Sequence, residues 1–161
     1  LYQKMKERGI KISSIQMQLS LLTKPSIEDE KIKHICYEND IEYLAYSPLA
    51  LGLLTVPPNQ TPTPSTFIRK KLFQRVIPKT QELRKLLTNI GEKYSASQAQ
   101  VALNWVRSHG AKPIVGIRNP LQAKDAISAI SWSLTQREKE RLDSYRNKCL
   151  ANMPQNPFTS P

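Results

Sequence analysis

A tyrosine and a serine, Tyr46 and Ser47, follow a short run of β-prone residues and precede Pro48. Pro48 cannot donate a hydrogen bond to a sheet, so the strand is predicted to end at Tyr46. An aromatic ring and a hydroxyl at the exit of a buried strand, followed by a loop with Gly52, suit a ligand site at the carboxyl ends of parallel strands. The alternative interpretation is an aromatic side chain that closes the core beneath a loop.

A second group suited to ligand binding stands at a predicted junction between a strand and a helix. The short apolar run Pro113–Val115 predicts a strand, and Arg118 follows it within a few residues. Asn119 is suited to cap the next helix, with Pro120 as its first residue and Gln122 in the reciprocal capping position. A cation beside the unpaired N–H groups of a helix N-terminus outlines an anion site. The alternative is a plain strand-to-helix turn with a surface arginine.

Gln16 is a third candidate because of its place in an alternating segment. Apolar residues occupy every second position from Ile15 to Leu21, which predicts a strand over about Ile12–Ser20. In a parallel barrel, a polar side chain near the exit of a strand can line the mouth of a site, whereas in an antiparallel sheet it would face water. Gln16 is therefore either a ligand donor or a solvent-facing amide.

The elements that must position these residues alternate between strand and helix. Ser26 and Asp29 match a capping box, so a helix is predicted to begin at Ser26 and to end near Asn39. The β-prone run Glu42–Tyr46 comes next. The order strand, helix, strand is that of a parallel crossover unit, which predicts an α/β fold.

Residues 56–65 separate the two halves of the chain. They contain four prolines and no periodicity, which predicts an extended loop, either a lid over a site or a disordered segment. Pro78 is then predicted to open a helix, and Thr135 with Glu138 to cap a later one that reaches about Lys148.

A further helix is predicted between these two. Ser95 is its expected cap, with Gln98 in the reciprocal position, and Gly110 is its expected end. Trp105 belongs to this helix and is interpreted as a core residue.

Charge and hydropathy limit the classes of partner. The chain has 161 residues and a formal net charge of +11, but its basic residues are spread along the whole length. The densest basic cluster, residues 69–71, lacks the interleaved aromatic residues of a single-strand nucleic-acid platform. No apolar run approaches the roughly 20 residues that span a membrane. We therefore expect no nucleic acid and no membrane among its partners, while attraction for phosphate-bearing small molecules remains open.

The cysteines and histidines suggest no metal centre. Cys36 and Cys149 are far apart and are interpreted as reduced cysteines of an intracellular protein, for which we expect a cytoplasmic location. His34 and His109 lack the spaced partners that zinc requires, so surface or helix-end roles are expected. The charged segment Leu1–Gly9 is unlike a signal peptide and begins without Met inside an apparent helix, so we expect a fragment of a longer protein.

Three motifs, in this order, resemble the carboxyl-terminal half of an aldo-keto reductase. They are the runs Ser14–Leu22, Leu44–Leu49 with Gly52–Thr55, and Ile114–Pro120 with Gln122. Members of that family fold as an eight-stranded parallel (β/α)8 barrel, the TIM barrel. The resemblance implies a partial barrel in which residues 1–150 supply the last three strands and their helices, with the amino-terminal half of the same barrel as partner. Residues 151–161 would be a proline-rich tail.

The same resemblance implies an NADP site with three parts. Gln16 would hydrogen-bond the nicotinamide carboxamide, and Tyr46 would stack on the nicotinamide ring. The pyrophosphate would lie along a loop set made of Ser47, Leu49 and Gly52. The adenosine end and its 2′-phosphate would be surrounded by Gly116, Ile117, Arg118 and Gln122, with Asp125 near the adenine. Some positions depart from the family pattern: Ile15 and Leu19 replace a frequent Asn and Tyr, Ala50-Leu51 replaces a common Gly-Arg, and Ala126 replaces a frequent Asn.

The implied activity is NADPH-dependent reduction of aldehydes or ketones, with a small-molecule carbonyl compound as substrate. The family's catalytic Asp, Tyr, Lys and His belong to the half that would precede this chain, so no catalytic residue is assigned and the fragment alone should be inactive. An alternative from a different class is a non-catalytic nucleotide-sensing or regulatory subunit of the same fold. A third, a basic RNA-binding module, would show salt-dependent binding to single-stranded RNA. The sequence upstream of Leu1 would decide between the first two.

Overall fold

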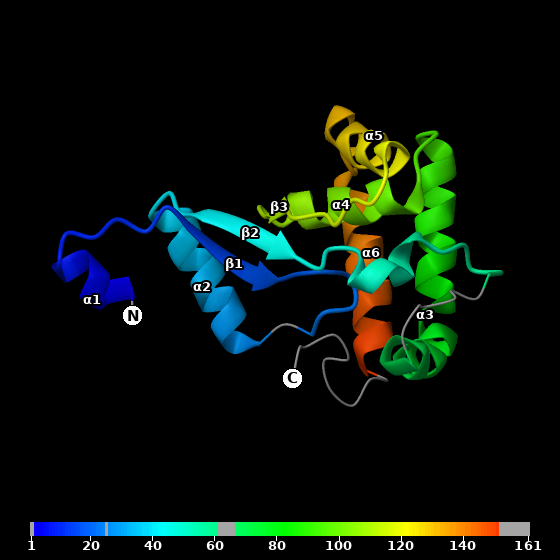
Figure 1. The fold of residues 1–161 in the computed structure, drawn as a ribbon, viewed down its shortest axis with the longest axis horizontal. Coiled ribbons are helices and arrows are strands. Elements are labelled where there is room, and N and C mark those ends of the chain that lie inside the picture. Colours follow the sequence, from blue (N-terminus) through cyan, green and yellow to red (C-terminus); the bar gives the residue numbers. More distant parts are fainter. Residues whose placement is uncertain (1, 25, 61–66, 152–161) are drawn as a thin grey trace.

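The computed structural model describes residues 2–24, 26–60 and 67–151 (Figure 1). A three-stranded parallel sheet in the order β1-β2-β3 lies beside a layer of helices. The strands are β1 (Ser14–Gln18), β2 (Glu42–Tyr46) and β3 (Lys112–Pro113). In the register, Gln16 is paired with Leu44, which is paired in turn with Lys112. The predicted α/β fold with parallel strands is therefore confirmed, and the carboxyl ends of all three strands lie at the same edge.

Two of the strands are shorter than the sequence pattern predicts. The predicted strand Ile12–Ser20 is too long at both ends, because pairing with β2 covers only Ser14–Gln18. The third strand ends at Pro113, one position after it begins, although the N–H of Ile114 still donates to the carbonyl of Ala45 at 2.8 Å. A proline is tolerated there because β3 is at the edge of the sheet.

The connection between β1 and β2 is the predicted crossover helix. It is α2 (Ile27–Glu38), and it follows the short helix α1 (Tyr2–Glu7). The capping box is present: the N–H of Asp29 donates to Ser26 Oγ at 3.1 Å, and the N–H of Ser26 donates to Asp29 Oδ2 at 2.7 Å. In Figure 1, α2 lies behind β1 and β2 and covers one face of them.

The helical layer begins with α3 (Phe67–Lys93), a helix of 27 residues. The prediction that Pro78 opens a helix is wrong, because Pro78 lies inside α3. Pro78 has no N–H for the carbonyl of Gln74, and the two parts of α3 point in different directions in Figure 1. The helix continues through this bend because Phe73 and Val76, before the proline, are buried in the core.

The next helix is α4 (Gln98–Ser108), and its predicted cap is also wrong. The cap is Ser97, whose Oγ accepts the N–H of Gln100 at 3.1 Å. Ser95 instead has a φ of +51°, in a turn that returns the N–H of Ala96 to the carbonyl of Gly91 at 2.8 Å. The helix ends near Gly110 as predicted.

Two more helices complete the layer, α5 (Pro120–Ser128) and α6 (Gln136–Ala151). Short 3-10 helices, η1 (Ala50–Thr55) and η2 (Ala129–Ser131), follow β2 and α5. The cap predicted for α6 is confirmed: Glu138 Oε2 accepts the N–H of Thr135 at 2.9 Å, and Thr135 Oγ1 accepts the N–H of Glu138 at 3.3 Å.

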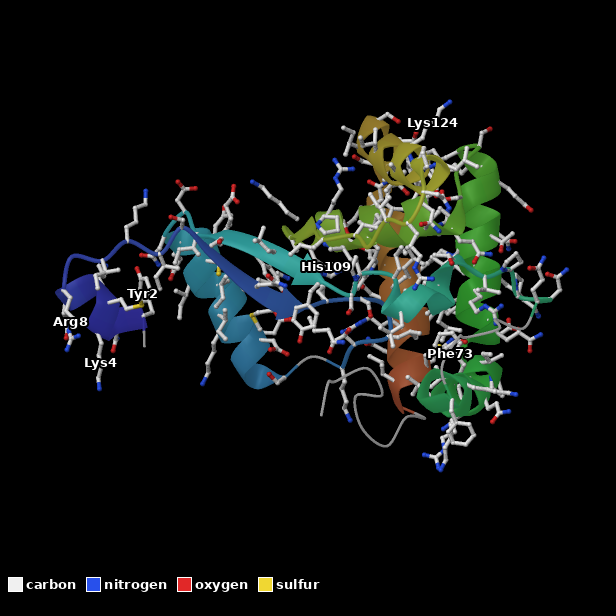
Figure 2. The ribbon with its side chains drawn as sticks, viewed as in Figure 1. Tyr2, Lys4, Arg8, Phe73, His109 and Lys124 are labelled. Atoms are coloured by element: carbon white, nitrogen blue, oxygen red, sulfur yellow. The ribbon has the colours of Figure 1, made fainter. Side chains whose placement is uncertain are left out.

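The core lies where α3, α4 and α6 pack together. Trp105 is 1% exposed, as predicted for a core residue, and its Nε1 donates to Asp143 Oδ1 at 2.8 Å. His109 caps the end of α4 (Figure 2), with its ring centroid 4.4 Å from that of Trp105. Burial lowers the pKa of His109 to about 4 despite the opposing effect of Asp143, so this helix-end histidine is neutral near pH 7.

Two of the predicted irregular segments lie partly or mostly outside the described residues. Of the loop 56–65, residues 61–65 are not described, and Gln60 closes a turn by donating its N–H to the carbonyl of Pro57 at 3.0 Å. Of the tail 151–161, only Ala151 is described, as the last residue of α6. Within the described ranges, no helix is long and apolar enough to cross a membrane.

Candidate functional site

One face of the sheet, the open face, carries solvent-exposed side chains near the carboxyl ends of the strands. Residues of neighbouring parallel strands that are paired in register point to the same side of a sheet. Gln16 therefore shares a face with Leu44, and Tyr46 with Gln18. Gln16 is exposed and Tyr46 is 37% exposed, whereas Tyr43 and Ala45, on the opposite face, are 8% and 0% exposed. Tyr46 thus does not close the core, and its ring is accessible at the strand exit.

The chain leaves β2 through a loop with unusual backbone geometry. Four of its residues have positive φ: Ser47 at 54°, Ala50 at 49°, Leu51 at 56° and Gly52 at 92°. Non-glycine residues rarely adopt such angles, and clusters of them are typical of binding loops. At Gly52 the backbone angle explains the glycine, because a Cβ there would meet nothing within 4 Å.

The loop is anchored by apolar side chains on its inner side. Ala50, Leu53 and Leu54 are all 0% exposed, and Leu49 packs against the same core. The predicted pyrophosphate-binding residues Ser47, Leu49 and Gly52 therefore lie on one loop, which begins directly after Tyr46. The apolar side chains on the inner side of this loop are packed in the core.

The third part of the predicted site lies between β3 and α5. Asn119 caps α5, and its Oδ1 accepts the N–H of Gln122 at 2.9 Å. Gln122 Oε1 accepts the N–H of Arg118 at 2.9 Å, so it reaches one residue further back than a capping box requires. Gly116, Ile117 and Arg118 are exposed.

The guanidinium of Arg118 is available for a ligand. It takes part in no ion pair with the residues that the structure describes. The bond from its N–H to Gln122 fixes its backbone next to the first turn of α5. A cation held beside a helix N-terminus, with no carboxylate partner in these parts of the chain, can bind an anionic group.

Asp125 has a structural role that its place in the sequence does not show. Its Oδ2 accepts the hydroxyl of Ser97 at 2.8 Å, and its Oδ1 accepts the side-chain N–H of Gln100 at 2.7 Å. The carboxylate thereby ties α5 to the first turn of α4. The hydrogen-bond partners lie 28 and 25 residues away in sequence, so no local pattern could have revealed them.

The structure brings most of the predicted site residues to the carboxyl ends of the strands in three groups, whereas Asp125 lies on α5 and is bonded to α4. Gln16 and Tyr46 share the open face, the loop follows Tyr46, and residues 116–118 follow β3, whose parallel pairing with β2 brings its end to the same edge. Within the described residues, no group of three or more His, Cys, Asp or Glu side chains is placed to hold a metal ion. The arrangement suits binding of an extended, partly anionic ligand.

Comparison with known proteins shows the family to which the chain is similar. The model of the Aldo/keto reductase family matches residues 1–147. The chain is 36% identical over 154 residues to pyridoxal reductase, chloroplastic, of Arabidopsis thaliana. The aligned residues cover 96% of this chain and 42% of that protein. It is 26% identical over 139 residues to the NADPH-dependent alpha-keto amide reductase of Saccharomyces cerevisiae, covering 84% of this chain and 38% of that protein.

Solved structures show the same fold in proteins of lower sequence identity. The thermostable aldo-keto reductase Tm1743, solved with the inhibitor epalrestat, superposes with a TM-score of 0.64 at 18% identity, over 90% of this chain and 44% of that one. An aldo/keto reductase from Brucella melitensis gives a TM-score of 0.60 at 21% identity, over 90% and 43%. The chain spans about two fifths of the length of the curated relatives named above. On the evidence of its three motifs, its parallel fold and the family match over residues 1–147, this chain belongs to the aldo/keto reductase family.

Proposed function

We propose that the protein containing this chain is an NADPH-dependent oxidoreductase that reduces aldehydes or ketones to alcohols. In this proposal the chain supplies the cofactor-binding half of a (β/α)8 barrel. The observation that carries it is that an exposed aromatic ring, Tyr46, and an exposed cation, Arg118, both follow the carboxyl ends of neighbouring parallel strands. The NADPH-dependent alpha-keto amide reductase among the relatives supports the choice of cofactor.

The residues present fit the cofactor. The accessible ring of Tyr46 offers a flat face for the nicotinamide, and the exposed amide of Gln16 on the same sheet face can donate to and accept from its carboxamide. At the other end, the guanidinium of Arg118 and the N–H groups at the start of α5 can bind the 2′-phosphate together. Gly116 leaves open space where a Cβ would stand, which allows close approach to the backbone.

In this proposal the chain binds and orients NADPH. When bound, NADPH supplies the hydride that reduces the carbonyl carbon. The loop from Ser47 to Gly52 would fix the pyrophosphate, so that the nicotinamide lies at the open face. The acid that protonates the carbonyl oxygen would come from the amino-terminal half of the barrel, where the resemblance places the family's catalytic Asp, Tyr, Lys and His.

The open face also supports the proposed barrel. β1 and β3 are both edge strands, and the face that carries Gln16 and Tyr46 is not covered by a described helix. A closed barrel needs further strands on both edges and fills its interior with side chains. The amino-terminal half is therefore the proposed partner of this face.

Arg118→Ala in the full-length protein tests the choice of cofactor. Loss of a charged hydrogen bond should weaken NADPH binding by about 1.5–3 kcal/mol and leave NADH binding nearly unchanged. Both affinities can be measured by quenching of protein fluorescence. The matched control is Lys124→Ala, which removes an exposed cation from α5, the helix that follows Arg118 (Figure 2).

The two cofactor titrations separate the possible outcomes. Equal losses for NADPH and NADH would show that Arg118 does not recognise the 2′-phosphate. Tight NADPH binding without oxidation of NADPH by any simple aldehyde or ketone would favour the non-catalytic, nucleotide-sensing subunit. No binding of either cofactor by the wild-type protein would overturn the proposed function.

A further inference from the structure

A buried arginine lies directly behind the loop that follows β2. Arg84 is in the second part of α3 and is 0% exposed. Its Nε donates to the carbonyl of Val56 at 2.9 Å, and its Nη2 donates to the carbonyls of Gln60, at 2.8 Å, and of Pro57. Within the described ranges it has no ion-pair partner, and its Nη1 is buried without a hydrogen bond.

A second buried side chain reaches the same segment from α4. The amide of Gln98 lies 3.0 Å from the carbonyl oxygen of Val56 and 3.3 Å from that of Leu54 when its nitrogen faces them. That orientation is required because an amide oxygen cannot accept from two carbonyls. Arg84 and Gln98 together therefore hold the carbonyl groups of four residues: Leu54, Val56, Pro57 and Gln60.

The segment so held adjoins the strained part of the loop. The last residue of the loop with a positive φ is Gly52, and the first of the four bound carbonyls is that of Leu54, two residues later. Positive φ at non-glycine residues such as Ala50 and Leu51 is strained and persists only where the surroundings enforce it. The buried Leu53 and Leu54 enforce it on one side, and the carbonyl contacts of Arg84 hold the chain immediately after them.

A buried guanidinium bound only to carbonyl groups is a poor choice for stability alone. Burial lowers the pKa of Arg84, which reflects the cost of taking its charge out of water. An apolar side chain of similar volume in place of a buried charge is often neutral or stabilising. The planar fork of arginine is, however, the side chain that can donate to several carbonyls at fixed angles.

We propose that Arg84 is a positioning residue for the cofactor loop, Ser47–Thr55. In this inference, which rests on the proposed function, Arg84 does not touch the cofactor. It fixes the backbone carbonyls that follow the loop, and so keeps Ser47 to Gly52 in the shape that receives the pyrophosphate. Its removal should loosen the loop and weaken NADPH binding while the helical core stays folded.

The test compares Arg84→Met, Arg84→Lys and Arg75→Met in the full-length protein. Arg75 is an exposed arginine of the same helix and is the matched control. Hydrogen exchange without cofactor should be faster in the peptide covering residues 47–60 of Arg84→Met and unchanged in α4 and α6. NADPH dissociation constants should rise about 10- to 100-fold, with kcat at saturating NADPH within about twofold of wild type. Arg84→Lys should be intermediate, and Arg75→Met should match wild type.

Three results would overturn the inference. The first is wild-type exchange of residues 47–60 in Arg84→Met. The second is faster exchange throughout α3, α4 and α6, which would make Arg84 an ordinary part of the core; if Arg84→Met were insoluble, Arg84→Lys would decide this by the same measurement. The third is a wild-type protein that does not bind NADPH, which would refute the proposed function itself, whereas NADPH binding that Arg84→Met leaves unchanged would refute only the role of Arg84.

Discussion

Polar side chains of the helical layer are buried and paired within the chain, whereas those at the carboxyl ends of the strands, called the edge below, are exposed. In the layer, Glu138 is 6% exposed and is bound by Lys93 at 2.7 Å and by the hydroxyl of Tyr94 at 2.9 Å. At the edge, Tyr46 is 37% exposed, and Arg118 is exposed without an ion-pair partner among the described residues.

This difference distinguishes polar side chains that stabilise the fold from polar side chains that are free to bind a ligand. A buried polar group that has its partners within the chain stabilises the fold, and its loss leaves those partners unpaired. An exposed aromatic or cation contributes little to stability, so its substitution mainly affects whatever binds there. Changes in the layer should therefore lower the free energy of unfolding, and changes at the edge should affect ligand binding.

The largest expected effect comes from leaving the open face without its proposed partner. Purified residues 1–161 alone should associate, because both edge strands and the face of Tyr46 would be uncovered. They should also lack carbonyl reductase activity, since loss of a positioned acid alone costs about 10²–10⁴-fold in rate. Sedimentation velocity and NADPH absorbance measure the two effects. Turnover by the isolated chain that Tyr46→Ala abolishes would contradict this prediction.

The comparison of layer and edge is sharpened by Trp105→Ala. Removal of this 1% exposed side chain should lower the unfolding free energy of the full-length protein by about 3–5 kcal/mol, because it leaves a cavity and removes the hydrogen bond to Asp143. Urea denaturation provides the measurement. Tyr37→Ala, at a residue 90% exposed, is the control and should change stability by less than about 0.5 kcal/mol. Similar losses for both variants would mean that Trp105 is not a core residue.

The two faces of β2 can be compared directly. Tyr43→Ala removes an 8% exposed ring and should cost about 3–5 kcal/mol of unfolding free energy. Tyr46→Ala, three residues later on the open face, should cost less than about 1 kcal/mol and should weaken NADPH binding. Urea denaturation and NADPH titration of both variants check the pair. Equal stability losses would show that the open face is covered in the full-length protein by contacts as extensive as those of the core.

The Glu138 network predicts a loss of stability in acid. Burial alone raises the pKa of Glu138, but hydrogen bonds from Lys93, Thr135 and Tyr94 outweigh it and bring that pKa to about 2, from an ordinary 4.5. A depressed carboxyl pKa contributes stability that is present above pH 4.5 and is lost as the pH falls toward 2. The contribution is up to about 3 kcal/mol.

Glu138→Gln should remove most of that dependence on pH. The measurement is the unfolding free energy between pH 7 and pH 3, with Glu140→Gln, an exposed carboxylate of the same helix, as the control. An unchanged slope in Glu138→Gln would mean that the acid sensitivity comes from other groups, such as the half-buried, neutral His109.

Local signals in the sequence were sufficient wherever an element is specified by its own neighbours. The capping residues Ser26 and Thr135 bind groups three positions away, so their patterns predict the helix starts correctly. The alternation around Gln16 and the order strand, helix, strand predict the parallel sheet. The three motifs also carry the family, because their residue types and spacing are themselves the evidence for it.

Packing between distant segments decided the rest. Pro78 and Ser95 look like helix starts by local rules, yet the burial of Phe73 and Val76 carries α3 past the proline, and a turn gives the cap of α4 to Ser97. Arg84 resembles any polar residue of a long helix until α3 and the segment after β2 are packed together, 28 residues apart in sequence. A local pattern reports only contacts within a few residues, whereas burial and long-range hydrogen bonds depend on which surfaces meet in the folded protein.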